Sequence, residues 1–333
     1  MNEPLHPSSL SEILDRTAQI YRSRFLVFLG IAIIPTAVLV AFAGCGVLAF
    51  VLTGLNTATP VAGLAAVLAF AALGMVVLPI FIAVTALATA AMSHAAARLF
   101  LGQAVTIRDS YKAVWRRGWQ YIGVWFLQIA AVWIVPIAAW IAAIFSSTLF
   151  GALAGRAGMG VNGGIVAFFM FIVVAGLVTY GVWMNLRLSL AFPACVVEQI
   201  GPWNALRRTS ALSQGTKGRI LLLYLLGAAL NWIVTIAVWL PVTIVIAIVV
   251  GSGNPQRAEA VGTLAGFAIY GVSFAVQALT RPVYGIALVL FYYDQRIRQE
   301  AFDIEWMMLQ AGLVVPLPTQ PSEPSTAAIG EPI

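Results

Sequence analysis

Six long apolar runs constrain the fold of this chain more than any other feature. They cover residues 25–53, 61–97, 121–150, 165–197, 220–250 and 261–293. One helix crosses about 30 Å of bilayer hydrocarbon with about 20 mainly apolar residues. Only 9% of the residues are charged, against about 25% in an ordinary soluble domain. The sequence therefore predicts an all-α, polytopic transmembrane helical bundle with six spans.

The positive charges predict how this bundle is oriented. On one side of the six spans, Lys and Arg gather in four segments, residues 16–24, 98–117, 187–219 and 296–298. The other side holds only Arg156 and Arg257. Because positive residues favour the cytoplasmic side of a membrane, we expect both termini in the cytoplasm. Cutting the second run at Pro79 would give seven spans and would put positive clusters on both faces.

The remaining composition argues against several function classes. The net charge of +6 flanks the apolar runs and forms no single patch, so we expect no nucleic-acid binding. The first 24 residues lack the apolar core of a cleavable signal peptide, which leaves the first span as the membrane signal. The chain's Cys and His residues, which are Cys45, Cys195, His6 and His94, stand in no metal-binding or catalytic spacing. We therefore expect no enzyme activity, no metal and no cofactor.

Three short polar segments precede the first, third and fifth runs and resemble one another. They cover residues 9–25, 106–119 and 201–219. Cap signals open each of them: Ser9 with Glu12, Thr106 with Asp109, and Pro202. Gly118 and Gly215 are typical helix stops for the second and third. Each segment is expected to be a short helix in the cytoplasmic interface, with its apolar side on the lipid bilayer and its basic residues toward anionic headgroups.

These segments recur about every 96 residues, and the ends of the later hairpins also match. Val197-Glu198-Gln199 corresponds to Tyr293-Asp294-Gln295. We infer three repeats of an interfacial helix plus two spans. The alternative is that basic amphipathic flanks are common to membrane proteins. The predicted organisation is an N-terminal segment over residues 1–24, a membrane domain over 25–310 with interfacial helices near 106–117 and 202–214, and a disordered tail over 311–333.

Polar residues inside the apolar runs are the candidates for a site, because each is costly at membrane depth unless it is paired or wet. The residues singled out are Arg187, Glu198, Asn231 and Arg281, with Gln128 and Gln277 similarly placed. Eleven residues separate Arg187 from Glu198, so both can share one face of the fourth helix. These residues either form a polar pocket for a lipid headgroup or solute, with Arg187 or Arg281 as the cation, or they serve in interhelical hydrogen bonds and snorkelling.

The two acidic residues at the matching repeat positions have a simpler expected role. We predict that Glu198 and Asp294 pair with local arginines, and the candidates are Arg208, Arg296 and Arg298.

Three stretches of the chain resemble a family of bacterial membrane proteins. They read SLSEILDRTAQIYRSRF at residues 9–25, RLSLAFPACVVEQIGPWNALRRTSALSQGTKGRILLLYLLG at residues 187–227, and LVLFYYDQRIRQEAFDIEW at residues 288–306. The family is named after the membrane domain of glycerophosphoryl diester phosphodiesterases. In those enzymes the chemistry belongs to a separate soluble barrel for which this chain has no room, so the resemblance implies a stand-alone member without that activity. It also implies a bacterial inner-membrane location.

Two functions remain open from the sequence. The leading hypothesis is a non-enzymatic scaffold or accessory subunit that engages a membrane-protein partner through its interfacial helices and tail. The alternative is a transporter or lipid-binding protein with a polar cavity between the hairpins.

Overall fold

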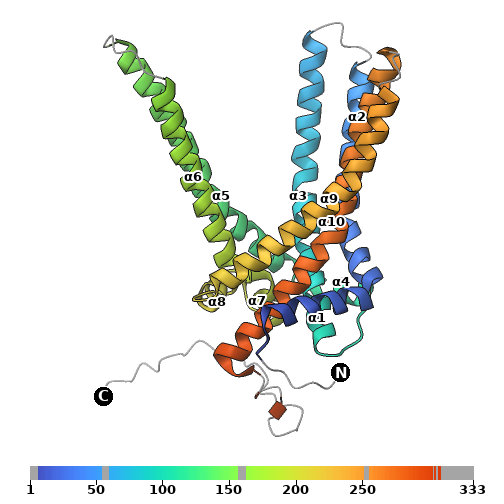
Figure 1. Cartoon of the computed structure of the whole chain (residues 1–333), viewed down its shortest axis with the longest axis vertical. Helices are drawn as coiled ribbons and strands as arrows, with labels where there is room; N and C mark the ends of the chain where they lie inside the picture. The colour runs from blue at the N-terminus through green and yellow to red at the C-terminus, as the bar shows by residue number, and fades with distance from the viewer. Residues whose placement is uncertain are drawn as a thin grey trace, which may run out of the picture.

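The chain is mainly helical in the part that the computed structural model describes, which is residues 7–54, 60–156, 163–250, 255–302, 304 and 307–308. The helices are α1 (Leu10–Ser23), α2 (Phe25–Gly54), α3 (Pro60–Phe100), α4 (Ile107–Trp115), α5 (Gly118–Arg156), α6 (Gly163–Leu188), α7 (Ala191–Val197), α8 (Pro202–Leu212), α9 (Lys217–Val250) and α10 (Pro255–Glu300). The predicted all-α fold is confirmed. A short helix followed by two long ones occurs three times, with α7 added after α6 (Figure 1). The predicted tail, residues 311–333, lies outside the described residues.

Six stretches of helix in the described ranges are long and apolar enough to cross a membrane, which confirms the predicted number of spans. They belong to α2, α3, α5, α6 with α7, α9 and α10. Helix α3 continues from Pro60 to Phe100 through Pro79, so the seven-span division is wrong. Helix α10 has 46 residues, about 69 Å at 1.5 Å per residue, and so exceeds a hydrocarbon core of roughly 30 Å. The chain is a multi-pass membrane protein.

The fourth span is interrupted near its end, where the sequence suggested a continuous helix. Helix α6 ends at Leu188 and α7 begins at Ala191. Pro193 explains the break, because it has no N–H for the carbonyl of Ser189 and its ring crowds that carbonyl. The expectation that Arg187 and Glu198 share one face of a continuous helix is therefore wrong.

The short helices α1, α4 and α8 lie together at one end of the bundle, beside α7 (Figure 1). Ser9 and Glu12 form the predicted capping box. Thr106 caps α4 by accepting from the Asp109 backbone, and Pro202 opens α8. The end signals are only half right. Gly215 does lie in the turn after α8 with φ of 79°, whereas Gly118 begins α5 instead of ending α4.

The apolar faces of these short helices pack on the protein itself, so the prediction that they rest on the bilayer is wrong for the residues at their centres. Helix α1 packs against α10, α4 against α3, and α8 against α5 and α7. Each helix buries a hydroxyl that donates to a carbonyl one turn earlier. These hydroxyls belong to Thr17, Ser110 and Thr209. This shared hydrogen bond supports the inference that the three helices belong to structural repeats.

Two tyrosines fasten the short helices to the spans. Tyr21 of α1 donates to the carbonyl of Leu279 in α10 at 2.8 Å. Tyr111 of α4 donates to the carbonyl of Ile31 in α2 at 3.1 Å, and burial raises the pKa of Tyr111 to about 12. The end of the bundle that contains α1, α4, α7 and α8, here called the platform, is therefore packed and hydrogen-bonded against the spans.

The hairpin of α5 and α6 leans away from α2, α3, α9 and α10, so the spans diverge from the platform (Figure 1). Side chains are most closely buried near the platform, as along Ala95, Ala96 and Tyr292. Above it, the separation of the hairpins leaves cavities between α3, α5, α6, α9 and α10.

Candidate ligand-binding cavity

Two adjoining cavities occupy the space between the leaning hairpin and the other spans. The first, here called the polar chamber, has a volume of about 300 Å³ and is lined by residues of α3, α5, α6, α7, α9 and α10. The second, the apolar groove, has a volume of about 470 Å³ and lies mainly between α5 and α6. Both volumes are within the range of about 300–1,000 Å³ that small-ligand sites occupy.

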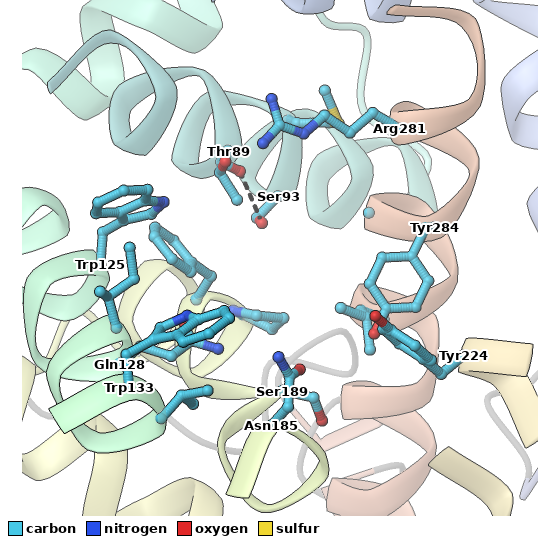
Figure 2. A pocket seen from close by; sticks show the side chains of 17 residues that line it. Thr89, Ser93, Trp125, Gln128, Trp133, Asn185, Ser189, Tyr224, Arg281 and Tyr284 are labelled. Atoms are coloured by element: carbon cyan, nitrogen blue, oxygen red, sulfur yellow. Dashed lines mark hydrogen bonds between the residues drawn. The ribbon is translucent and has the colours of Figure 1, made fainter. Parts of the chain in front are cut away.

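Helical spacing aims polar side chains from several helices into the polar chamber. Thr89 and Ser93 are one turn apart on α3, and Arg281 and Tyr284 are one turn apart on α10. Figure 2 shows these side chains around an open space, with Trp125, Gln128 and Trp133 of α5 on the opposite side. A β-carbon on Gly285 would lie 3.0 Å from the sulfur of Met92, so glycine there lets α10 approach α3 closely.

Some polar groups of the chamber already have a hydrogen-bond partner within the protein. The hydroxyl of Thr89 donates to the carbonyl of Thr85 at 2.8 Å, and that of Ser93 donates to the carbonyl of Thr89 at 2.9 Å. The amide of Gln128 donates to the carbonyl of Leu188 at 3.3 Å, which ties α5 to the end of α6. These groups shape the wall of the chamber.

Two other polar groups of the chamber have no such partner. Among the described residues, the guanidinium of Arg281 and the amide of Asn185 make no hydrogen bond or ion pair. The side chains that line the chamber include no Asp or Glu, so Arg281 gives it a single positive charge. A space with unsatisfied donors and a net positive charge favours an anion as its ligand.

The position of Arg281 along its helix adds to its significance. Thirteen residues separate it from Asp294, about 20 Å along α10 at 1.5 Å per residue. A charged side chain near the centre of a membrane helix costs about 2.5–3.5 kcal/mol on insertion scales. Figure 2 shows its guanidinium reaching into the chamber toward α3. The sequence candidate Arg281 thus lies in the cavity as a cation without a partner in the described chain.

The three other residues singled out from the sequence do not line the polar chamber. Asn231 of α9 accepts a hydrogen bond from the hydroxyl of Thr280 in α10 at 2.9 Å and lines neither cavity. Arg187 lies with its guanidinium 5.4 Å from the ring of Trp183, and the amine of Lys217 lies 5.0 Å from the same ring. Asn231 therefore bridges helices, and Arg187 takes part in cation–π contacts outside the cavities.

Glu198 belongs to a network of ion pairs at the platform. Its carboxylate pairs with Arg208 at 3.0 Å and with Arg296 at 3.8 Å, and it accepts the hydroxyl of Tyr292. Glu300 pairs with the same two arginines. Burial alone would lower the pKa of Arg208, but hydrogen bonds and attraction from Glu198 and Glu300 raise it overall. The predicted pairing of Glu198 with Arg208 and Arg296 is confirmed, and it links α7, α8 and α10.

Asp294 is the centre of a second network. Its side chain is only 2% exposed and pairs with Arg298 at 3.0 Å and with Arg219 at 3.2 Å. It also accepts the backbone N–H of Ser8 at 2.8 Å, while both arginines donate to the Ser8 carbonyl. The predicted pairing with Arg298 is confirmed. Arg219 was missed because it is 75 residues away in the chain.

Sequence reasoning also missed Asn185, Tyr224 and Tyr284, all of which line the polar chamber. Asn185 is a lone amide inside an apolar run, as Asn231 is, so the same criterion could have identified it from the sequence. The tyrosines carried no such signal, because their position depends on how α9 and α10 meet the leaning hairpin.

The chamber offers hydrogen-bond donors rather than a set of metal ligands. In the described part of the chain, no group of three or more His, Cys, Asp or Glu residues is placed to hold a metal ion.

Comparison with known proteins gives no relative. No protein-family model, no curated protein and no solved structure matches the chain. The resemblance to the membrane-domain family therefore stays a prediction.

Proposed function

We propose that this membrane protein binds a ligand with an anionic group in the polar chamber, as a lipid-handling or transport protein. Arg281 is the cation that meets the anion, and the amide of Asn185 is a second donor. The observation that carries the proposal is the guanidinium of Arg281, which belongs to the candidate span Gly271–Glu300 and reaches into a cavity without an acidic partner in the described chain. Binding and release of the ligand require no chemical step in this proposal.

The scaffold hypothesis has less support from the described residues. It rested on the absence of catalytic motifs and on three basic helices at the cytoplasmic face, and the centres of the apolar faces of those helices are buried against the bundle, as at Ile13 and Val114. The tryptophans that remain exposed at this end, Trp115, Trp119 and Trp203, are typical of a membrane interface belt.

The charge pattern supports an orientation for the proposed protein. Helices α1, α4 and α8, which overlap three of the four positive segments, lie at one end of the bundle, and Arg156 and Arg257 belong to helix ends at the other. By the positive-inside bias, the platform faces the cytoplasm. We propose the bacterial inner membrane as the location, together with membership of the family named above.

A binding experiment tests the proposed function. The purified protein, its Arg281→Gln variant and its Arg187→Gln variant are titrated with phosphatidylglycerol and with phosphatidylcholine by native mass spectrometry. Arg187→Gln is the matched control, because it removes a cation that lines neither cavity. We expect Arg281→Gln to weaken phosphatidylglycerol binding at least tenfold, about 1.4 kcal/mol, and Arg187→Gln to leave it within about threefold. Equal affinities in all three proteins would contradict the proposal.

A further inference from the structure

The polar chamber adjoins the apolar groove. The residues that line both are Val132, Trp133, Asn185 and Tyr224. From this shared wall the groove continues along α5 as far as Trp140 and along α6 as far as Leu177. At 1.5 Å per residue these distances are about 10 Å and 12 Å. A polar compartment and an elongated apolar one therefore lie side by side with a common wall.

The two compartments suit different chemical groups. Beyond the shared wall, the groove is lined by apolar side chains such as Pro136, Ile137, Val178 and Val182. A charged or hydroxylated group would lose its hydrogen bonds there without replacement, whereas a hydrocarbon chain has none to lose. In the polar chamber the preference is reversed, because Arg281 and Asn185 present donors that a hydrocarbon cannot satisfy.

The groove is an open cavity rather than an enclosed one. Trp140 is 40% exposed and Val178 is 59% exposed, although both belong to spans. The hairpin that carries them leans away from the other spans (Figure 1). In a bilayer these walls face lipid chains, so a chain can enter the groove without passing through water.

We infer that the ligand is an anionic phospholipid, with its phosphate at Arg281 in the polar chamber and one acyl chain in the apolar groove. The inference rests on the proposed function and names its substrate class. The position of its headgroup distinguishes this bound lipid from the lipids that surround the protein, because the headgroups of the surrounding lipids stay at the membrane interface. Arg281 lies about 20 Å along α10 from the charged platform, so the bound headgroup is drawn into the depth of the bundle.

Two glycines of α6 provide the test. A β-carbon at Gly181 or at Gly176 meets no atom within 4 Å, so a larger side chain fits at either position. Gly181 lines the apolar groove and Gly176 does not. Leucine is a better helix former than glycine, so neither Gly181→Leu nor Gly176→Leu should weaken α6.

Both variants, the wild type and Arg281→Gln are titrated with dioleoyl phosphatidylglycerol, dihexanoyl phosphatidylglycerol and inorganic phosphate by native mass spectrometry. We expect Gly181→Leu to weaken binding of the dioleoyl lipid at least tenfold, because leucine fills the path of the chain, and to change binding of the dihexanoyl lipid less than about threefold. Gly176→Leu should match the wild type with both lipids. Inorganic phosphate should bind more weakly than either lipid, and wild-type binding of phosphate as tight as that of the dioleoyl lipid would contradict an acyl-chain site.

The remaining outcomes separate this inference from the proposed function. If Gly181→Leu retains the dioleoyl lipid while Arg281→Gln loses it, the anion site stands and the acyl-chain site is wrong. If Gly181→Leu weakens both lipids equally, or if Gly176→Leu weakens them as much, the groove does not hold the chain. If Arg281→Gln retains both lipids, the proposed function itself is wrong. A stable dimer that excludes lipid would assign the groove to a second copy of the chain.

Discussion

Helix α10 carries two charged residues with opposite surroundings. Asp294 lies at the platform and is neutralised by Arg219 and Arg298, with Ser8 completing its hydrogen bonds. Arg281 lies about 20 Å away along the same helix and has no partner in the described chain. A charge that is satisfied within the chain holds the fold together. A charge left open in a cavity indicates a partner from outside the chain.

The largest effect should follow loss of the carboxylate at the platform. Asp294→Asn leaves Arg219 and Arg298 facing each other beside a buried neutral amide, which should cost about 3 kcal/mol of unfolding free energy. Thermal unfolding of the detergent-solubilised protein, followed by circular dichroism, measures it. The control is Asp109→Asn, an exposed residue in the first turn of α4, where the cost should stay below about 1 kcal/mol. Equal shifts in Tm would show that the Asp294 network does not hold the fold.

Loss of the second acidic residue should have a smaller effect. Glu198→Gln removes charge-assisted hydrogen bonds with Arg208 and Tyr292, but Glu300 still pairs with Arg208 and Arg296. We expect a cost of about 2 kcal/mol in the same unfolding measurement. The double variant with Glu300→Gln should lose more than the sum of the single variants, because both arginines then lack a carboxylate. Additive losses would contradict a shared network.

Removal of the unpartnered cation should act in the opposite direction. Arg281→Leu deletes a charge that no residue of the described chain satisfies, so the delipidated protein should gain about 1 kcal/mol in unfolding free energy. Addition of phosphatidylglycerol should raise the Tm of the wild type and leave that of the variant unchanged, because only the wild type gains a ligand. A variant that unfolds earlier than the wild type without lipid would mean that Arg281 supports the fold.

The smallest effects sharpen the comparison between two asparagines of the spans. Asn231→Ala removes an interhelical hydrogen bond with Thr280, worth about 0.6 kcal/mol in membrane helices, and should leave lipid binding intact. Asn185→Ala removes a donor of the polar chamber that bonds to nothing in the described chain. It should leave the Tm unchanged and weaken phosphatidylglycerol binding severalfold. If the two variants show the same pattern, the distinction between structural and ligand-binding polar residues is wrong.

Hydropathy and charge were sufficient to predict the six spans and the ion pairs of Glu198, because these depend on neighbours in the chain or on the bilayer itself. They could not predict the break before α7. Pro193 is visible in the sequence, but whether a proline bends a helix or ends it depends on what the freed carbonyls meet. Arg281 was identified as a candidate, whereas its lack of a partner depends on the angle between the hairpins, which long-range packing sets.

The short helices show a second limit of sequence patterns. The sequence predicts an apolar side for each short helix, and Ile13 belongs to that of α1, but an apolar side does not reveal whether it faces lipid or protein. In α1 both Ile13 and Thr17 are buried, and the hydroxyl of Thr17 donates to the carbonyl of Ile13. A Thr on the apolar side, able to bond within its own helix, favours close contact with another helix over insertion among lipid chains.

The most direct test of the proposed lipid site is a high-resolution structure of the protein in nanodiscs that contain phosphatidylglycerol as a minor component. We expect density for one phospholipid, with its phosphate within hydrogen-bonding distance of Arg281 and one acyl chain running past Gly181 between α5 and α6. A closed chamber, or a guanidinium of Arg281 paired with a carboxylate of this chain, would contradict it.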